Sequence, residues 1–474
     1  MARIVVIGAG VVGLGAAMLL AGDGHQVVVL ERDPAPPPND PAEAWQHWQR
    51  PGVNQFRLPH GFLAGFRSVL DAELPAVSEA LQAAGALRRN YIRDVLPAAM
   101  TGGWRDGDEC YELLTGRRPV VEAVLAAAAE STPGVEIRRG MAVTGLVSGA
   151  SALPGVPHVA GVRTKAGKSI PADLVVDMTG RRSALPDWLQ GIGARRPTEE
   201  LENSGFLYYG CHFRSADGSL PVMLGPAVMQ WGTITSLTLS ADNGTWALGI
   251  VTGSKDTALR PLRELARWEA VVRSLPLVAH WLDGTPIEDD IQVMGRLEDR
   301  YRGFVVHGTP VATGVAAVAD SWACSNPANG RGASIGMLHA LTLRDQLRAV
   351  GLDDPVTFAD AFHTATAETV EPWYRTTLAT DRYRLGEIEA GIRGETYDPQ
   401  DPQYQLEMAL DAASRHDPDC LRASLDIRFV LRTPEEVFAR TELRDKTVEL
   451  GSGWREEQPL GPDREQLLAL ASTQ

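Results

Sequence analysis

Three glycines near the start of the chain stand at the spacing of a phosphate-binding turn. Gly8, Gly10 and Gly13 follow the apolar run at 3–7 and open a helical pattern over 14–20. Gly8 permits a tight turn, Gly10 lets the backbone approach a pyrophosphate, and Gly13 lets the helix pack against the strand. Free N–H groups at the helix start would then face the phosphates. The spacing predicts dinucleotide binding, with contacts from Gly8, Gly10, Val11, Val12 and Gly13.

An acidic residue follows at the position that suits the sugar of such a ligand. The second apolar run, 27–30, ends in Glu31, eighteen residues after Gly13. A carboxylate there accepts hydrogen bonds from a ribose diol. We therefore expect Glu31, with the adjacent Arg32, to contact the dinucleotide.

Composition limits the class of protein. The chain has 474 residues, 44% of them hydrophobic and 22% charged, and a net charge of −15. These values are typical of a globular protein of two or three domains, and the negative charge argues against nucleic-acid and anionic-membrane partners. We expect no membrane span, since no apolar run is long enough. Four cysteines without a CxxC pair favour a cytoplasmic protein without a redox dithiol, and the histidine spacing predicts no metal site.

Alternating apolar strands and helices predict an α/β fold. The apolar run at 173–180 suits a strand of a parallel sheet, and the α/β pattern resumes at 315–320. Strands are also predicted at 135–139, 142–147 and 159–163, and helices at 119–130 and 332–350. Between 206 and 292 the pattern changes to longer strands with polar and aromatic alternation. The strands predicted there are 207–214, 233–239 and 246–251, with a helix over 261–282.

The predicted organisation is a Rossmann-like dinucleotide-binding domain with an insertion. Residues 1–195 and 296–350 would form this domain, and residues 196–295 a mainly antiparallel sheet domain for the substrate. Residues 351–474 would form a helical C-terminal region.

Two later segments add groups suited to a flavin. Asp177–Gly180 ends an apolar strand in a glycine, and Asp320 at another strand end can accept from the hydroxyls of a ribityl chain. Pro327 shapes the following turn. Asn329, Gly330, Arg331 and Gly332 would then offer N–H groups and a cation at a helix start, which favours the anion of a reduced flavin.

With these three segments the chain resembles the FAD-dependent aromatic hydroxylases, the class A flavoprotein monooxygenases typified by para-hydroxybenzoate hydroxylase. The resemblance covers residues 1–350 in the order of its motifs. Ala319 departs from the family pattern, which has glycine there. The resemblance also implies cofactor contacts from Arg50 and Gln55 in the segment 50–60, and from Arg118, which would close over the FAD pyrophosphate.

The resemblance implies a reaction in which the flavin carries the chemistry. FAD is held non-covalently, NADPH or NADH reduces it, and O₂ forms a C4a-hydroperoxide that hydroxylates or epoxidises a small apolar or aromatic substrate. No catalytic side chain is required. Tyr208, Tyr209 and His212, on one strand of the inserted sheet, are the candidate substrate contacts.

Other functions fit parts of the same pattern. A flavin-dependent reductase of the geranylgeranyl-reductase type would keep the fold and transfer hydride to an alkene. A separate flavin reductase would replace NAD(P)H as the direct electron donor, and a non-catalytic flavin-binding protein needs no donor. Residues 332–336 also match the GxSxG turn of serine hydrolases, but Ser334 is expected inside a helix rather than directly after a strand.

Overall fold

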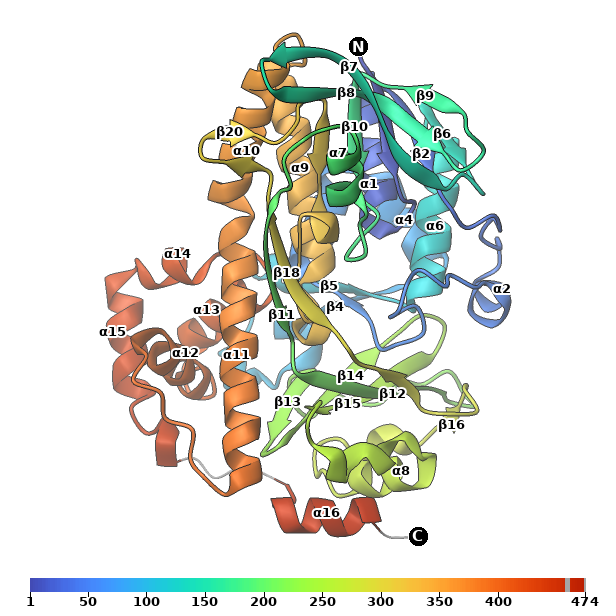
Figure 1. Cartoon of the computed structure of the whole chain (residues 1–474). Coiled ribbons are helices and arrows are strands. Elements are labelled where there is room, and N and C mark those ends of the chain that lie inside the picture. Colours follow the sequence, from blue (N-terminus) through green and yellow to red (C-terminus); the bar gives the residue numbers. More distant parts are fainter. Residues whose placement is uncertain (457–460, 473–474) are drawn as a thin grey trace.

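A five-stranded parallel sheet forms the centre of the N-terminal part of the molecule (Figure 1). The structure is a computed structural model and describes residues 1–456 and 461–472. Every neighbouring pair of strands in this sheet is parallel. In spatial order the strands are β21 (Val315–Ala317), β10 (Leu174–Asp177), β1 (Arg3–Ile7), β2 (Gln26–Leu30) and β6 (Val135–Arg138).

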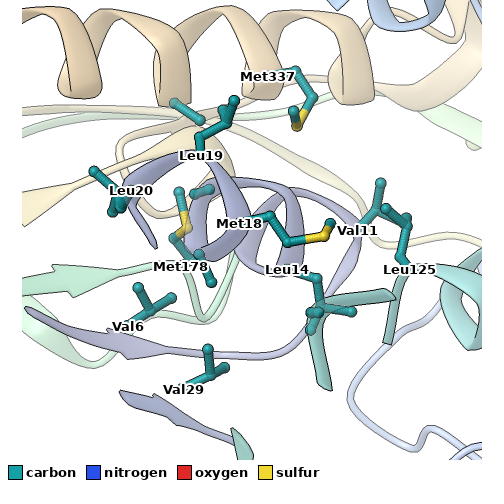
Figure 2. Packing of buried hydrophobic residues seen from close by; sticks show 14 of the residues in the cluster. Val6, Val11, Leu14, Met18, Leu19, Leu20, Val29, Leu125, Met178 and Met337 are labelled. Carbon is teal, nitrogen blue, oxygen red and sulfur yellow. The ribbon is translucent and has the colours of Figure 1, made fainter. Parts of the chain in front are cut away.

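Helix α1 (Val11–Gly22) packs between this sheet and helix α9 (Gly332–Val350). Figure 2 shows Leu14 and Met18 of α1 among buried side chains from both sides, with Met337 of α9 opposite. A Cβ at Gly15 would stand 2.7 Å from the Met337 sulfur, so the glycine permits this close approach. The packing fixes the start of α1 relative to the start of α9.

Smaller elements surround the parallel sheet. Helix α6 (Arg118–Ser131) contacts α1 and β6. Two three-stranded antiparallel sheets lie beside it, β7 (Val143–Leu153), β8 (Val156–Thr164) and β9 (Ser169–Pro171), and β3 (Gly61–Phe62), β5 (Glu112–Thr115) and β4 (Leu87–Asn90). The remaining helices of this part are α2 (Pro41–His47), α3 (Ala64–Glu73), α4 (Pro75–Ala83), α5 (Ala98–Thr101) and α7 (Leu185–Gly191), with a π-helical turn η1 at Tyr91–Val95.

A second, antiparallel sheet lies at the lower end of the molecule in Figure 1. Its order is β13 (Val228–Trp231), β14 (Ile234–Ser240), β15 (Thr245–Gly253), β12 (Phe206–Arg214) and β16 (Thr285–Pro286), and β17 (Gln292–Met294) also pairs with β12. The single helix predicted over 261–282 is wrong. The segment forms 3-10 turns at Thr257–Arg263 and Ala279–Leu282 around the short helix α8 (Leu265–Arg273). Pro276, which lacks an N–H group, lies in the interruption between α8 and the second turn.

Two antiparallel strands connect the sheets. Strand β11 (Thr198–Asn203) carries the chain toward the antiparallel sheet, and β18 (Glu298–Gly303) returns beside it. The short strand β22 (Ala323–Cys324) pairs with β18 and precedes α9. A small hairpin, β19 (Val305–Val306) and β20 (Thr309–Pro310), follows β18.

The C-terminal part is helical, as predicted. Helix α11 (Glu371–Arg393) runs from the side of the parallel sheet to the antiparallel sheet, and α12–α15 gather beside it (Figure 1). The helices are α10 (Pro355–Thr369), α12 (Pro402–Ala413), α13 (Pro418–Arg428), α14 (Pro434–Phe438), α15 (Thr441–Leu450) and α16 (Arg464–Ser472). The predicted fold class is confirmed. Within the described residues, no helix is both long and apolar enough to cross a membrane.

Candidate functional site

One large cavity, of about 1010 Å³, joins segments that lie hundreds of residues apart. At one end it is lined by the glycine turn that follows β1, and along its length by the segment from Val318 to the start of α9. The antiparallel sheet, η1, α5, and helices α11, α12 and α13 form the rest of its wall. The predicted cofactor residues on this wall are Gly10, Val11, Val12, Gly13, Gln55, Arg118, Asp320, Pro327, Asn329, Gly330, Arg331 and Gly332.

The glycine turn leaves no room for side chains on its packed side. Gly8 has a φ of 107°, and a Cβ there would stand 2.6 Å from the Met178 carbonyl oxygen. A Cβ at Gly13 would stand 2.2 Å from the Gly8 oxygen. Gly10 differs, because a Cβ there would meet nothing within 4 Å and Gly10 lines the cavity. The turn therefore presents bare backbone to the cavity at the start of α1.

Glu31 lies outside the cavity wall and holds the turn from behind. Its carboxylate accepts from the backbone N–H groups of Ala9 and Asp33, both at 2.9 Å, and pairs with Arg50 at 2.7 Å. Burial of an ion pair is costly unless its remaining polar groups are satisfied, and here they are. Arg32 is exposed with its guanidinium beside Gly52, also off the cavity wall.

Arg50 does not line the cavity; it connects the glycine turn and the end of β2 to helix α6. Its guanidinium contacts Glu31, Asp33 and Glu122, the last at 2.9 Å, and donates to the Ala9 carbonyl at 3.1 Å. Glu122 also pairs with Arg118 at 2.6 Å. Through Glu122, the buried Arg50 therefore fixes Arg118 at the cavity wall.

The segment Asp177–Gly180 contacts the segment that carries Asp320 directly. Asp177 accepts from the backbone and hydroxyl of Thr179 at 3.0 and 2.7 Å, which shapes the turn after β10. The Gly180 N–H then donates to the Ser321 hydroxyl at 3.0 Å. This contact places the end of β10 beside the 3-10 turn Ala319–Ser321 that carries Asp320.

Asp320 is a half-buried carboxyl group on the cavity wall. None of the described residues donates a hydrogen bond to it, and loss of solvent raises its pKa. Arg181 and Arg118, which line the same cavity, lower that pKa by electrostatic attraction. A carboxylate without a protein partner in such a cavity suits hydroxyl groups of a ligand.

Ala319 adopts a left-handed backbone, with a φ of 56°. Glycine occupies this conformation without strain, whereas a Cβ carries a cost of about 1–2 kcal/mol. The substitution of alanine for the expected glycine therefore keeps the local backbone and strains it. The Ala319 N–H donates to Nδ1 of the buried His339 at 3.1 Å, which helps to hold the turn.

Sequence reasoning did not identify Arg181, which lines the cavity directly after the Asp177–Gly180 segment. Its Nη1 atom is buried without a partner among the described residues, and its Nη2 lies 3.4 Å from the Ser325 carbonyl. A buried guanidinium with an unused donor next to a glycine turn is typical of an anion site. Its position one residue after the glycine was the available signal.

The three candidate substrate residues separate in space. Tyr208 and Tyr209 line the cavity, and the Tyr208 hydroxyl donates to the Asn326 side chain. His212 is buried away from the cavity wall, where Nδ1 lies 2.8 Å from Glu288 and its ring contacts Trp45. The Ser334 hydroxyl, inside α9, accepts from the Phe66 N–H at 3.1 Å.

The site has the groups that an FAD molecule requires. Bare N–H groups open α1, unpaired cationic donors lie nearby at Arg181, and a carboxyl without a partner stands midway at Asp320. The glycine-rich start of α9 lies farther along the same wall. An extended dinucleotide such as FAD would have to contact all of these places at once.

The fold is similar to that of the class A FAD-dependent monooxygenases, and the family comparison agrees with FAD as the class of cofactor. Residues 3–40 match the model of the FAD dependent oxidoreductase family. Protein Rv3254 of Mycobacterium tuberculosis is 27% identical over 394 residues, covering 78% of this chain and 77% of that protein. The resemblance stated from the sequence is thereby confirmed for the cofactor class and the fold.

Two solved structures illustrate the similarity. PqsL, a probable FAD-dependent monooxygenase from Pseudomonas aeruginosa, superimposes with a TM-score of 0.59 at 15% identity, over 82% of this chain and 96% of its own. OxyS anhydrotetracycline hydroxylase from Streptomyces rimosus gives a TM-score of 0.57 at 18% identity, over 91% and 77%. At these identities the likeness concerns the fold.

Proposed function

We propose that this chain is an FAD-dependent monooxygenase that inserts one oxygen atom from O₂ into a small apolar or aromatic molecule. The observation that carries the proposal is the continuous cavity, which joins the glycine turn and the segment 318–332 to a region where apolar side chains lie beside charged ones from α11, α12 and α13. The apolar side chains are Leu96, Met100, Leu113, Met229, Leu237, Leu421, Leu425 and Phe429. When bound, FAD supplies two-electron reduction by NAD(P)H and activation of O₂.

The protein's own residues would hold and enclose the cofactor. Backbone N–H groups at Gly10–Gly13 with Arg118 bind the pyrophosphate, Asp320 binds the ribityl hydroxyls, and Gly330–Gly332 face the ring. The apolar side chains of the cavity exclude water from the reacting centre. In this assignment residues 1–195 and 296–350 hold the cofactor, and residues 196–295 carry the substrate wall, including Tyr208 and Tyr209.

A labelling experiment tests the proposal. The FAD-loaded protein, supplied with NADPH, is screened under ¹⁸O₂ with aromatic acids and amines, starting from 2-aminobenzoylacetate, with which PqsL has been crystallised. We expect a product that contains one ¹⁸O atom, detected by mass spectrometry. Gly10→Ala, which places a methyl group in the cofactor end of the cavity, is the inactive control.

The same experiment separates the alternatives. A reduced product without label would refute oxygen insertion and favour the alkene reductase. Flavin that NADPH reduces only after a flavin reductase is added would assign electron delivery to a partner. Flavin that neither donor reduces, with any compound tested, would favour a binding protein.

A further inference from the structure

Helix α11 contacts the loop of residues 325–332 through two side chains one turn apart. Thr377 accepts from Nη1 of Arg331 at 3.3 Å. Asp381, four residues later on the same face of the helix, accepts on Oδ1 from the side-chain amides of Asn326 and Asn329, at 3.1 and 3.3 Å. The loop before α9 is thus held from a helix that begins about 40 residues after it.

The antiparallel sheet contacts the same loop from another direction. The Tyr208 hydroxyl on β12 donates to Oδ1 of Asn326 and accepts from the Ala328 N–H. Asn326 therefore has its amide oxygen on Tyr208 and its amide nitrogen on Asp381. These two contacts fix the orientation of the amide, and the loop is joined to both the sheet and α11.

Asp381 lies in a setting that is costly for a carboxyl group. It is 4% exposed, and its Oδ2 atom is buried with no partner among the described residues. The charged and titratable groups that act on it are Asp299 from β18 and Arg331 at the start of α9, with the Tyr208 hydroxyl nearby. Burial raises the pKa of Asp381 well above its usual value, which favours the protonated form over the charged one. Each buried polar group left without a partner calls for an explanation.

We propose that Asp381 is a positioning residue for the cofactor: by binding Asn326 and Asn329 from α11, it holds the 325–332 loop in the conformation that faces the flavin. This inference rests on the proposed function, since it requires FAD in the cavity. It assigns part of the cofactor site to the C-terminal helices. Asp381 itself need not touch the cofactor. The Asn326 amide between Tyr208 and Asp381 cannot relay a proton without changing tautomer, so the role of Asp381 is to orient the loop.

The side chain at 381 can be changed in two informative ways. Asp381→Asn keeps an oxygen acceptor of the same size at the position of Oδ1, so this variant should preserve the loop. Asp381→Leu has similar bulk but no acceptor, so it leaves two amide donors without their partner. Tyr208→Phe removes the second contact to the same amide.

The experiment measures FAD binding to the full-length apoprotein by quenching of flavin fluorescence, followed by the absorption spectrum and midpoint potential of the loaded protein. We expect Asp381→Leu to weaken FAD binding about tenfold or more and to shift the flavin spectrum and potential. Asp381→Asn should stay within about threefold of the wild type. The double variant Tyr208→Phe with Asp381→Leu should lose less than the product of the single losses, because both act on one amide.

Asp426→Leu is the matched control. Asp426 is equally buried, on α13, where it accepts from the Tyr111 hydroxyl at 3.0 Å and pairs with Arg432. Its loss should lower the melting temperature and leave the flavin spectrum unchanged. If Asp381→Leu does not fold, Asn326→Ala is used in its place, because it removes the same contact from the loop side.

The outcomes are distinguishable. Wild-type protein that binds no FAD overturns the proposed function and this inference together. Wild-type protein that binds FAD, with Asp381→Leu or its replacement unchanged in affinity and spectrum, overturns this inference alone. A loss of affinity that matches the Asp426→Leu control, with no spectral shift, also overturns it.

Discussion

Substituting alanine at Gly13 and at Gly10 tests two separate requirements of the glycine turn, which are close packing of its backbone and open space for the cofactor. A methyl group at Gly13 would stand 2.2 Å from the Gly8 oxygen, about 1 Å inside ordinary van der Waals contact. Because backbone must move to relieve this, we expect Gly13→Ala to cost about 1–3 kcal/mol of stability. In a chain of this length that corresponds to a fall of about 1–3 °C in the melting temperature.

Gly10→Ala should behave in the opposite way. Its methyl group meets nothing within 4 Å, and the backbone there has an ordinary φ of −84°. The melting temperature of the apoprotein should therefore change by about 1 °C or less, since the change from glycine to alanine at this N-cap costs only part of a kcal/mol. FAD affinity should fall about 100-fold, because the methyl group occupies the place of the pyrophosphate.

Scanning fluorimetry of the apoproteins and fluorescence titration with FAD measure both effects. The reasoning is refuted if Gly10→Ala binds FAD like the wild type, since the pyrophosphate would then lie elsewhere. It is also refuted if Gly13→Ala leaves the apoprotein as stable as the wild type.

Three further changes have definite expected results. Ala319→Gly should raise the free energy of unfolding by about 1 kcal/mol, measured by urea denaturation, because it removes the strain at a φ of 56°; a loss of stability would contradict this. Asp242→Ala should cost about 3–5 kcal/mol, since it leaves the buried Arg117 guanidinium without the carboxylate that it contacts at 2.6 Å; an unchanged denaturation midpoint would show that the pair contributes nothing. Burial raises the pKa of Asp299 from 3.8 to about 6. Between these pH values the folded state holds a proton that the unfolded state has lost, so the free energy of unfolding falls as the pH rises from about 4 to 6. Asp299→Asn should remove that fall, so the melting temperature of the variant minus that of the wild type should be larger at pH 7 than at pH 4. The same difference at both pH values would refute the assignment.

The parts of the site that depend on neighbours in sequence were predictable. The turn at Gly8–Gly13, its flanking strands and α1 follow from local spacing, and α9 begins at Gly332 as expected. The departure at Ala319 was visible in the sequence, although its positive φ was not. Each of these features is determined within about 30 residues of chain.

The parts that depend on distant contacts were not predictable. The ribose contact of Glu31 stays a prediction, and the sequence did not indicate that its carboxylate also binds Ala9, Asp33 and Arg50, the last from a loop 19 residues away. The partner of His212 is Glu288, 76 residues along the chain. Asp381 has no motif of its own, and only the packing of α11 against the loop gives it a role. Periodicity and spacing carry no information on such pairings.

The cavity wall has a consequence for how the protein is made. The glycine turn of this wall leaves the ribosome about 400 residues before Leu425 and Phe429, which line the same cavity. The parallel sheet is also incomplete until β21 is synthesised, because one edge of β10 has no partner strand before residue 315 has emerged. A nascent chain therefore carries an incomplete site and exposed apolar surface while the residues between these segments are synthesised. A cofactor that binds only the assembled cavity should then add to the stability of the folded protein by mass action, and should slow its proteolysis relative to the apoprotein.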